Sequence, residues 1–335
     1  MSDWTYSPEA SADWLEVFAD VRVALHDGGW GVVGASVAGR RRAVADAAPV
    51  DGVRARRELQ DACMAAVSRR GELVVAVADG AGKARLGGYG ARIPVATAVP
   101  LMTQVTYWSP AGGIVPYDSA HEWREAAYRV MRCVRAMLVR GARERGAARE
   151  ELACTLTLVY ANPVMVLAAQ LGDGRAAALW NNGVWEAITM PQRGEYAGET
   201  QFLTSNGWRR DPMRVGFSMQ MGCVEAIALL TDGCERVAFE CQSRDGTSGR
   251  YAEANLPHAP FLTPNVRTLQ RLLRPNVGHA VERVAATWEA FLREGTPELP
   301  ALRDEPDDKT LLLAVRERGV STAHEATSST VPRAD

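Results

Sequence analysis

The chain has 335 residues, of which 47% are hydrophobic and 23% are charged, enough for a large buried core. The net charge of −2 argues against a nucleic-acid-binding protein and a polybasic membrane protein. No run approaches the ~20 apolar residues of a membrane-spanning helix, and the N-terminus lacks the pattern of a signal peptide. The six cysteines form no CxxC pair, so we expect free thiols in a cytoplasmic protein.

The first half of the chain predicts two strands and two helices. WGVVGASV at Trp30–Val37 is apolar and rich in β-branched residues, which favours a strand. LVVAVA at Leu73–Ala78 predicts a strand that is buried on both faces and followed at once by an aspartate. Gly87–Val99 is a weaker helix prediction because Pro94 interrupts it. Apolar residues at helical spacing predict a longer helix at Ser119–Glu150.

The second half predicts more strands and ends in helices and a strand. Apolar runs at 152–160, 164–171, 176–180 and 184–189, separated by turn residues, predict one antiparallel meander. The remaining elements are a buried strand at Ala226–Leu230, a polar surface loop at Cys241–Leu256, helices at Asn265–Leu273 and Val277–Arg293, and a strand at Thr310–Val315. Strands in runs, separated by paired helices, predict two stacked sheets with helices outside. From about residue 316 the tail is polar, and we expect it to be disordered.

Aspartates recur at the ends of these strands. Asp79 follows LVVAVA, Asp232 follows AIALLT, and Asp307 precedes KTLLLAV, while Asp61 precedes an apolar segment and Asp173 lies in a turn. A single Asp-Gly pair indicates only a turn. Carboxylates that converge raise one another's pKa unless cations neutralise them. The repetition therefore indicates a site for hard divalent ions such as Mg²⁺ or Mn²⁺.

The same residues carry a resemblance to a known family. Five motifs occur in family order: R-x-x-N-E/Q-D at Arg56–Asp61, D-G-x-G at Asp79–Gly82, G-D-S-R at Gly172–Arg175, S/T-D-G at Thr231–Gly233 and D-N-x-T at Asp307–Thr310. Leu59 departs from the first motif and Gly174 from the third. The chain resembles the type 2C, metal-dependent (PPM) family of serine/threonine protein phosphatases, and within it a bacterial subgroup.

The resemblance implies an α+β fold, a four-layer αββα sandwich of two antiparallel β-sheets flanked by helices. It implies one catalytic domain at residues 30–315, between an N-terminal extension at 1–29 and a tail at 316–335. It also implies hydrolysis of phosphoserine and phosphothreonine by a hydroxide that bridges two Mn²⁺ or Mg²⁺ ions. The partner would be a phosphoprotein substrate, in opposition to a Ser/Thr kinase.

Site residues follow from the resemblance position by position. Asp61 and Asp79 would bridge or flank the two metals, and the carbonyl of Gly80 would be a ligand. Asp232 and Asp307 would complete the second metal site. In addition, Asp173 would join Asp232 at a weaker third metal, and Arg56 would bind the phosphate through its two-pronged guanidinium.

Some positions leave alternatives open. Asp46 and Asp51 are rivals for the first metal ligand, Asp308 is a rival to Asp307, and Arg56 could be a surface arginine. Ala81 stands where many members have a histidine proposed as the general acid, so water would protonate the leaving group.

Two other functions remain open. Leu59 and Ala81 permit a pseudophosphatase or sensor that binds a partner without turnover. A hydrolase of another phosphoester is a further alternative. A P-loop is excluded at Gly80–Lys83, because Val77 and Ala84 stand where a P-loop needs glycine and Ser/Thr. Glu195 and Glu199, a candidate acid/base pair, are interpreted as solvated loop residues.

Overall fold

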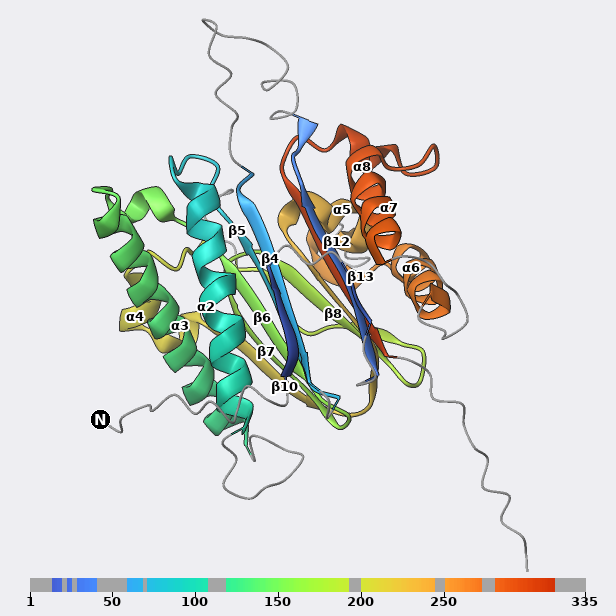
Figure 1. The fold of residues 1–335 in the computed structure, drawn as a ribbon, viewed down its shortest axis with the longest axis horizontal. Helices are drawn as coiled ribbons and strands as arrows, with labels where there is room; N and C mark the ends of the chain where they lie inside the picture. Colours follow the sequence, from blue (N-terminus) through green and yellow to red (C-terminus); the bar gives the residue numbers. More distant parts are fainter. Residues whose placement is uncertain are drawn as a thin grey trace, which may run out of the picture.

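The structure is a computed structural model that describes residues 14–19, 23–25, 29–40, 59–68, 71–107, 119–192, 200–244, 251–272 and 281–316. Two six-stranded antiparallel sheets form its centre (Figure 1). The first sheet has the order β1-β4-β5-β6-β7-β10, with strands Trp14–Ala19 (β1), Asp61–Ser68 (β4), Leu73–Asp79 (β5), Leu156–Ala161 (β6), Met165–Leu171 (β7) and Gly216–Met221 (β10).

The second sheet has the order β2-β3-β14-β11-β8-β9. Its strands are Val23–Leu25 (β2), Trp30–Val37 (β3), Lys309–Arg316 (β14), Val224–Leu230 (β11), Arg175–Trp180 (β8) and Trp185–Ala187 (β9). A separate two-stranded sheet pairs Phe239–Arg244 (β12) with Tyr251–Pro257 (β13). The strands predicted near residues 30, 73, 226 and 310 are confirmed.

Helices cover the outer face of each sheet (Figure 1). On the first sheet lie Gly87–Tyr107 (α2) and Ala120–Glu144 (α3). On the second lie Ala259–Leu272 (α6), Val281–Glu294 (α7) and Pro300–Asp304 (α8). Shorter helical pieces are Gly207–Arg210 (α4), Glu235–Ala238 (α5) and the 3₁₀ turns Arg149–Leu152 (η2), Pro212–Arg214 (η3) and Asp232–Cys234 (η4). The four-layer αββα sandwich that the resemblance implies is confirmed.

Three buried apolar layers explain why the central strands read as continuous apolar runs. In β5, Val74 and Ala76 pack towards α2 and α3, whereas Val75 and Val77 pack between the two sheets. Successive side chains of a strand point to opposite faces, and here both faces are covered. The residues of β14 alternate in the same way. Leu311 and Leu313 face the helices on the second sheet, whereas Leu312 faces the space between the two sheets.

The predicted meander is wrong as one continuous unit. β6 and β7 pair in the first sheet, whereas β8 and β9 pair in the second. The turn Gly172–Gly174 therefore carries the chain from one sheet to the other. Only residue spacing was available to predict the pairing, and the spacing is the same for a hairpin and for this crossing.

Two further sequence predictions need correction. The predicted loop at Cys241–Leu256 contains most of the β12–β13 hairpin. The first predicted helix continues through Pro94 and Pro100 to Tyr107, because burial of its apolar side against β4 and β5 outweighs the lost backbone bonds.

The second predicted helix is confirmed at its start. Ser119 caps α3 by accepting a hydrogen bond from the Glu122 N–H at 3.2 Å. The helix ends at Glu144, before the predicted Glu150, and η2 follows.

The N-terminal segment contributes a strand to each sheet. β1 pairs with β4, and β2 pairs with β3. The predicted tail from 317 onward lies outside the described residues. Among the helices that the structure describes, none combines the length and apolar character required to cross a membrane.

Candidate metal centre

Strand pairing brings Asp61 and Asp79 opposite each other. Asp61 is the first residue of β4, Asp79 is the last of β5, and the two are paired across this antiparallel ladder. An antiparallel strand begins where its neighbour ends, so two carboxylates far apart in the sequence meet at one edge. The backbone of Asp79 is fixed further by Thr155, whose Oγ1 accepts the Asp79 N–H at 3.0 Å and whose N–H donates to the Asp79 carbonyl at 2.8 Å.

The second sheet delivers two carboxylates in the same way. Asp232 follows β11 and Asp307 lies just before β14, and these two strands are antiparallel neighbours with Leu230 opposite Leu311. The fifth carboxylate, Asp173, lies in the turn that crosses between the sheets.

Four of these aspartates act electrostatically on the fifth, Asp79. Burial raises the pKa of Asp79 well above its usual range, and the charges of the other four aspartates raise it further, in the order Asp61, Asp232, Asp173 and Asp307. A group of like charges that is shielded from water is stable only when protons or cations neutralise it.

Two more of these carboxyls, Asp61 and Asp232, have strongly raised pKa values. Burial raises the pKa of Asp61 to about 7, although hydrogen bonds from Thr231 and Thr310 act in the opposite direction. Burial and then the charge of Asp173 raise the pKa of Asp232 to about 8. Near neutral pH both carboxyls therefore retain protons unless a bound cation displaces those protons.

The donor set suits a hard divalent cation. Asp61 Oδ1 is buried and has no hydrogen-bond partner among the residues that the structure describes, and a buried polar atom of this kind normally has one. Carboxylate and carbonyl oxygens are the ligands that Mg²⁺ and Mn²⁺ prefer. In the described ranges, no three Asp, Glu, His or Cys side chains are grouped closely enough to hold a metal ion, and the link between the carboxylates is the effect of their charges on Asp79.

Gly80 allows the backbone directly after Asp79 to lie in close contact with the start of α2. A Cβ at this position would lie 2.3 Å from the carbonyl oxygen of Gly87, the first residue of α2. The Gly80 N–H donates to the Gln60 carbonyl at 2.9 Å. Gly80 and Cys154 face each other in an isolated antiparallel bridge. Its two hydrogen bonds are made by neighbouring residues: the Ala81 N–H donates to the Ala153 carbonyl, and the Thr155 N–H donates to the Asp79 carbonyl. Neither of these two bonds uses the Gly80 carbonyl.

Asp307 and Asp308 differ in their surroundings. Asp308 is 2% exposed, and its carboxylate accepts the N–H groups of Gly39 at 3.1 Å and Gln60 at 2.8 Å. Asp307 is exposed, and its charge acts on Asp61, Asp79 and Asp232. Asp308 therefore links the segment after β3 to the start of β4. Of the two rivals, Asp307 is the better placed to meet a cation, because its side chain is exposed.

The turn that holds Asp173 is fixed on both sides. Thr200 Oγ1 donates to Asp173 Oδ2 at 2.7 Å. Arg175, which is fully buried, forms salt bridges to Glu253 at 2.8 Å and to Glu235 at 3.2 Å. Glu235 begins α5, directly after the turn that contains Asp232. Arg175 therefore links the Asp173 turn to the Asp232 turn.

Several sequence candidates lie outside the described residues. These are the phosphate-binding candidate, the two rivals for the first ligand and the alternative carboxylate pair: Arg56, Asp46, Asp51, Glu195 and Glu199. Sequence reasoning also overlooked polar residues that hold the aspartates. Thr231, Thr310 and Thr200 donate to the carboxylates of Asp61 and Asp173, Thr155 bonds the backbone of Asp79, and the Gln60 N–H donates to Asp308. Thr231 and Thr310 stand inside the quoted motifs, and a hydroxyl next to a buried carboxylate was the available signal.

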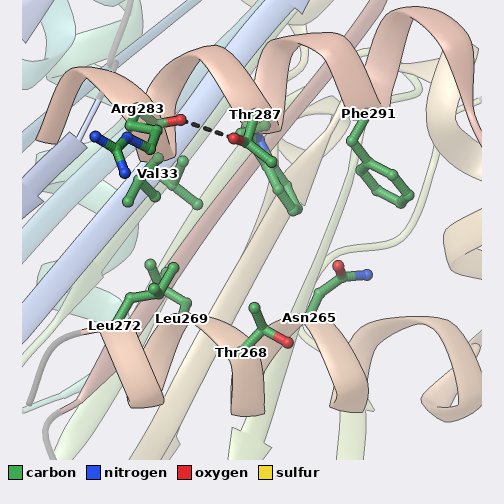
Figure 2. A pocket seen from close by; sticks show the side chains of 10 residues that line it. Val33, Asn265, Thr268, Leu269, Leu272, Arg283, Thr287 and Phe291 are labelled. Atoms are coloured by element: carbon green, nitrogen blue, oxygen red, sulfur yellow. Dashed lines mark hydrogen bonds between the residues drawn. The ribbon is translucent and has the colours of Figure 1, made fainter. Parts of the chain in front are cut away.

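A separate surface pocket lies away from these carboxylates. It has a volume of about 410 Å³ and lies between α6 and α7, above Val33 (Figure 2). Leu269 and Phe291 line it, and Arg283 is the charged residue among its described lining. The pocket offers a cation no carboxylate from these residues, so it is not the metal centre.

Comparison with known proteins decides the family. The sequence model of protein phosphatase 2C matches residues 53–285, more than half of the chain. The chain belongs to the protein phosphatase 2C family. The resemblance seen in the motifs is thereby confirmed, and so is the activity that it implies, metal-dependent hydrolysis of phosphoserine and phosphothreonine in proteins.

Individual relatives are also phosphatases. "Serine/threonine-protein phosphatase 3" of Escherichia coli (strain K12) is 29% identical over 268 residues, which cover 76% of this chain and 90% of that protein. A serine/threonine phosphatase from Staphylococcus aureus is 13% identical, with a TM-score of 0.49, over 89% of this chain and 98% of that one. The catalytic domain of the phosphatase PstP, solved in complex with two manganese ions, is 16% identical, with a TM-score of 0.46, over 85% and 97%.

Proposed function

We propose that this protein removes phosphate from serine and threonine side chains with two divalent cations, Mn²⁺ or Mg²⁺. The proposed ligands are the carboxylates of Asp61, Asp79, Asp232 and Asp307 and the carbonyl of Gly80. A weaker third cation would lie between Asp173 and Asp232. The observation that carries the proposal is the buried Asp61 Oδ1, which has no hydrogen-bond partner among the described residues and belongs to a carboxylate on which the charges of Asp307 and Asp308 act.

When bound, the cations supply the charge neutralisation and water activation of two-metal phosphoryl hydrolysis. The chain contributes rigid positions, because Asp61 and Asp79 stand on paired strands inside the sandwich. Asp307 is exposed, and Asp173 and Asp232 are half-buried, so the cluster is open to solvent on their side. A phosphorylated side chain reaches the cluster from that side. Ala81 provides no acid, so solvent water protonates the leaving oxygen.

The proposal also covers the phosphate-binding residue, the substrate and the cellular location. Arg56 is the candidate for binding the phosphoryl oxygens, since a guanidinium binds two of them at once. All these residues belong to the proposed catalytic domain at 30–315. The substrate is a phosphoprotein, and the enzyme opposes a Ser/Thr kinase in the cytoplasm. The family membership and the acidic cluster support this assignment.

The deciding experiment is turnover with and without metal. The purified chain is expected to hydrolyse p-nitrophenyl phosphate and a phosphothreonine peptide with Mn²⁺, to stop with EDTA and to recover when Mn²⁺ is restored. A cooperatively unfolding sample that shows no turnover with Mn²⁺ or Mg²⁺ would contradict the proposal. Tight Mn²⁺ binding without turnover would instead identify a binding module.

A further inference from the structure

The Asp61 carboxylate is hydrogen-bonded through one oxygen. Its Oδ2 accepts the hydroxyls of Thr231 at 2.7 Å and Thr310 at 2.8 Å. Its Oδ1 is buried and has no hydrogen-bond partner within the described part of the chain. Asp61 is 3% exposed, and both threonines are more deeply buried. The two oxygens of this carboxylate therefore have different surroundings.

The two threonines reach Asp61 from the other sheet. Thr310 lies in β14 and Thr231 directly follows β11, whereas Asp61 begins β4 of the first sheet. Thr231 Oγ1 also accepts the Thr310 N–H at 3.1 Å, and the Thr231 N–H donates to the Thr310 carbonyl at 3.2 Å. The Thr231 hydroxyl therefore cannot turn away from Asp61 without also breaking its bond from the Thr310 N–H, and the backbones of the two threonines are tied together.

Ser36 adds a third hydroxyl to the hydrogen bonds around Asp61. It pairs with Thr310 across β3 and β14, and the two hydroxyl oxygens lie 2.7 Å apart. A hydroxyl has a single proton to donate. The Thr310 hydroxyl donates to Asp61 Oδ2 and also lies within hydrogen-bond distance of Ser36 Oγ, and the Ser36 hydroxyl donates towards Cys63 Sγ at 4.0 Å. Ser36, Thr310 and Asp61 therefore belong to one connected group of buried and part-buried hydrogen bonds.

We propose that Thr231 and Thr310 are positioning residues that lock the rotation of the Asp61 carboxylate, so that Oδ2 is held by the second sheet and Oδ1 is reserved for a cation. The proposal rests on the proposed function. A carboxylate torsion is otherwise broad, and an unfixed side chain would have to be ordered when the cation binds. Partners behind a metal ligand typically change metal affinity about 10–100-fold.

The test compares hydroxyl removal with hydroxyl retention. Thr231→Val and Thr310→Val keep the branched shape that suits a strand end but cannot donate to Asp61. Mn²⁺ affinity, measured by titration calorimetry, is expected to fall about tenfold in each. Thr231→Ser and Thr310→Ser retain the hydroxyl and are expected to recover most of that affinity.

A matched control separates this effect from general loss of a buried hydroxyl. Thr103 is also buried, and its hydroxyl donates to the Pro100 carbonyl within α2 at 2.8 Å. Thr103→Val is expected to keep the wild-type Mn²⁺ affinity. Urea unfolding checks that each variant folds, and if Thr310→Val does not fold, Thr231→Val decides the question.

The outcomes distinguish this inference from the proposed function. Folded valine variants with wild-type Mn²⁺ affinity would overturn the positioning role while leaving the phosphatase assignment intact. A wild-type chain that binds no Mn²⁺ would overturn the proposed function and the inference together. Equal loss in the valine and serine variants would also overturn the inference, because the hydroxyl would then not be the decisive group.

Discussion

Asp308 accepts a 2.8 Å hydrogen bond from the backbone N–H of Gln60, the residue directly before Asp61. Its other carboxylate oxygen accepts the N–H of Gly39. One buried carboxylate thus joins the end of β3, the start of β4 and the start of β14. The neighbouring Asp307 carboxylate is exposed and belongs to the acidic cluster.

Substitution at these two neighbours should separate stability from metal binding. Asp308→Ala removes two buried hydrogen bonds to a charged group and is expected to lower the free energy of unfolding by about 3 kcal/mol. Asp307→Asn is expected to change that free energy by less than about 0.5 kcal/mol and to weaken Mn²⁺ binding. Urea unfolding in EDTA and titration calorimetry measure the two effects. The reverse pattern would assign the metal-binding role to Asp308.

Asp79→Asn tests the centre of the cluster. Loss of even an outer partner of a metal ligand costs about 10–100-fold, so we expect activity towards p-nitrophenyl phosphate to fall at least about 100-fold. The metal-free variant should be as stable as the wild type at pH 8 or more so, because a buried carboxyl with a raised pKa is replaced by a neutral amide. Retained activity would remove Asp79 from the site.

Stability of the metal-free protein should depend on pH. Asp61 and Asp232 have pKa values of about 7 and about 8 in the folded chain, above the ordinary 3.8. The folded state therefore holds more protons than the unfolded state between those values, and the free energy of unfolding falls as pH rises. This contribution is fully present below pH 3.8, and it is lost as pH rises through 7 and 8.

Urea midpoints in EDTA between pH 5 and pH 9 measure this slope. Asp232→Asn is the control, and it should flatten the upper part of the profile. Saturating Mn²⁺ should also reduce the slope, because the cation binds the ionised carboxylates. A metal-free midpoint that rises from pH 5 to pH 9 would contradict the raised pKa values.

The two glycines of the D-G-x-G motif should respond differently to a methyl group. At Gly80 a Cβ would meet the Gly87 backbone at 2.3 Å, whereas at Gly82 it would meet nothing within 4 Å. Gly80→Ala is therefore expected to lower the free energy of unfolding by about 1–3 kcal/mol and to weaken Mn²⁺ binding. Gly82→Ala, the matched control, should stay within about 0.5 kcal/mol of the wild type. Thermal and urea unfolding check both, and equal effects would show that contact with Gly87 is not the cause.

The sequence predicted the central strands well because they are buried on both faces. Such strands are continuous apolar runs with clear ends, as in Leu73–Asp79. The aspartates stand at those ends, so the pattern also indicated the acidic cluster. The family motifs added the αββα order of layers.

Pairing between strands was harder to predict. β7 and β8 are both wholly buried, and the turn between them is short, so their pattern does not reveal that they belong to different sheets. The β12–β13 hairpin was interpreted as a loop because its residues are polar. Salt bridges and hydrogen bonds from the buried Arg175 to Glu253 and Asn255 hold it, and none of these contacts is local in the sequence.

Strand limits follow from local hydrophobicity and turn chemistry, so the residue types at the strand ends could be read from the amino-acid order. Which of those residues meet depended on the folded arrangement. It placed Asp61 opposite Asp79, brought the Thr231 and Thr310 hydroxyls to one oxygen of Asp61, and left the Asp307 side chain exposed while burying that of the adjacent Asp308. The physical reason is that these contacts depend on which strands become neighbours, and burial of the whole chain selects those neighbours.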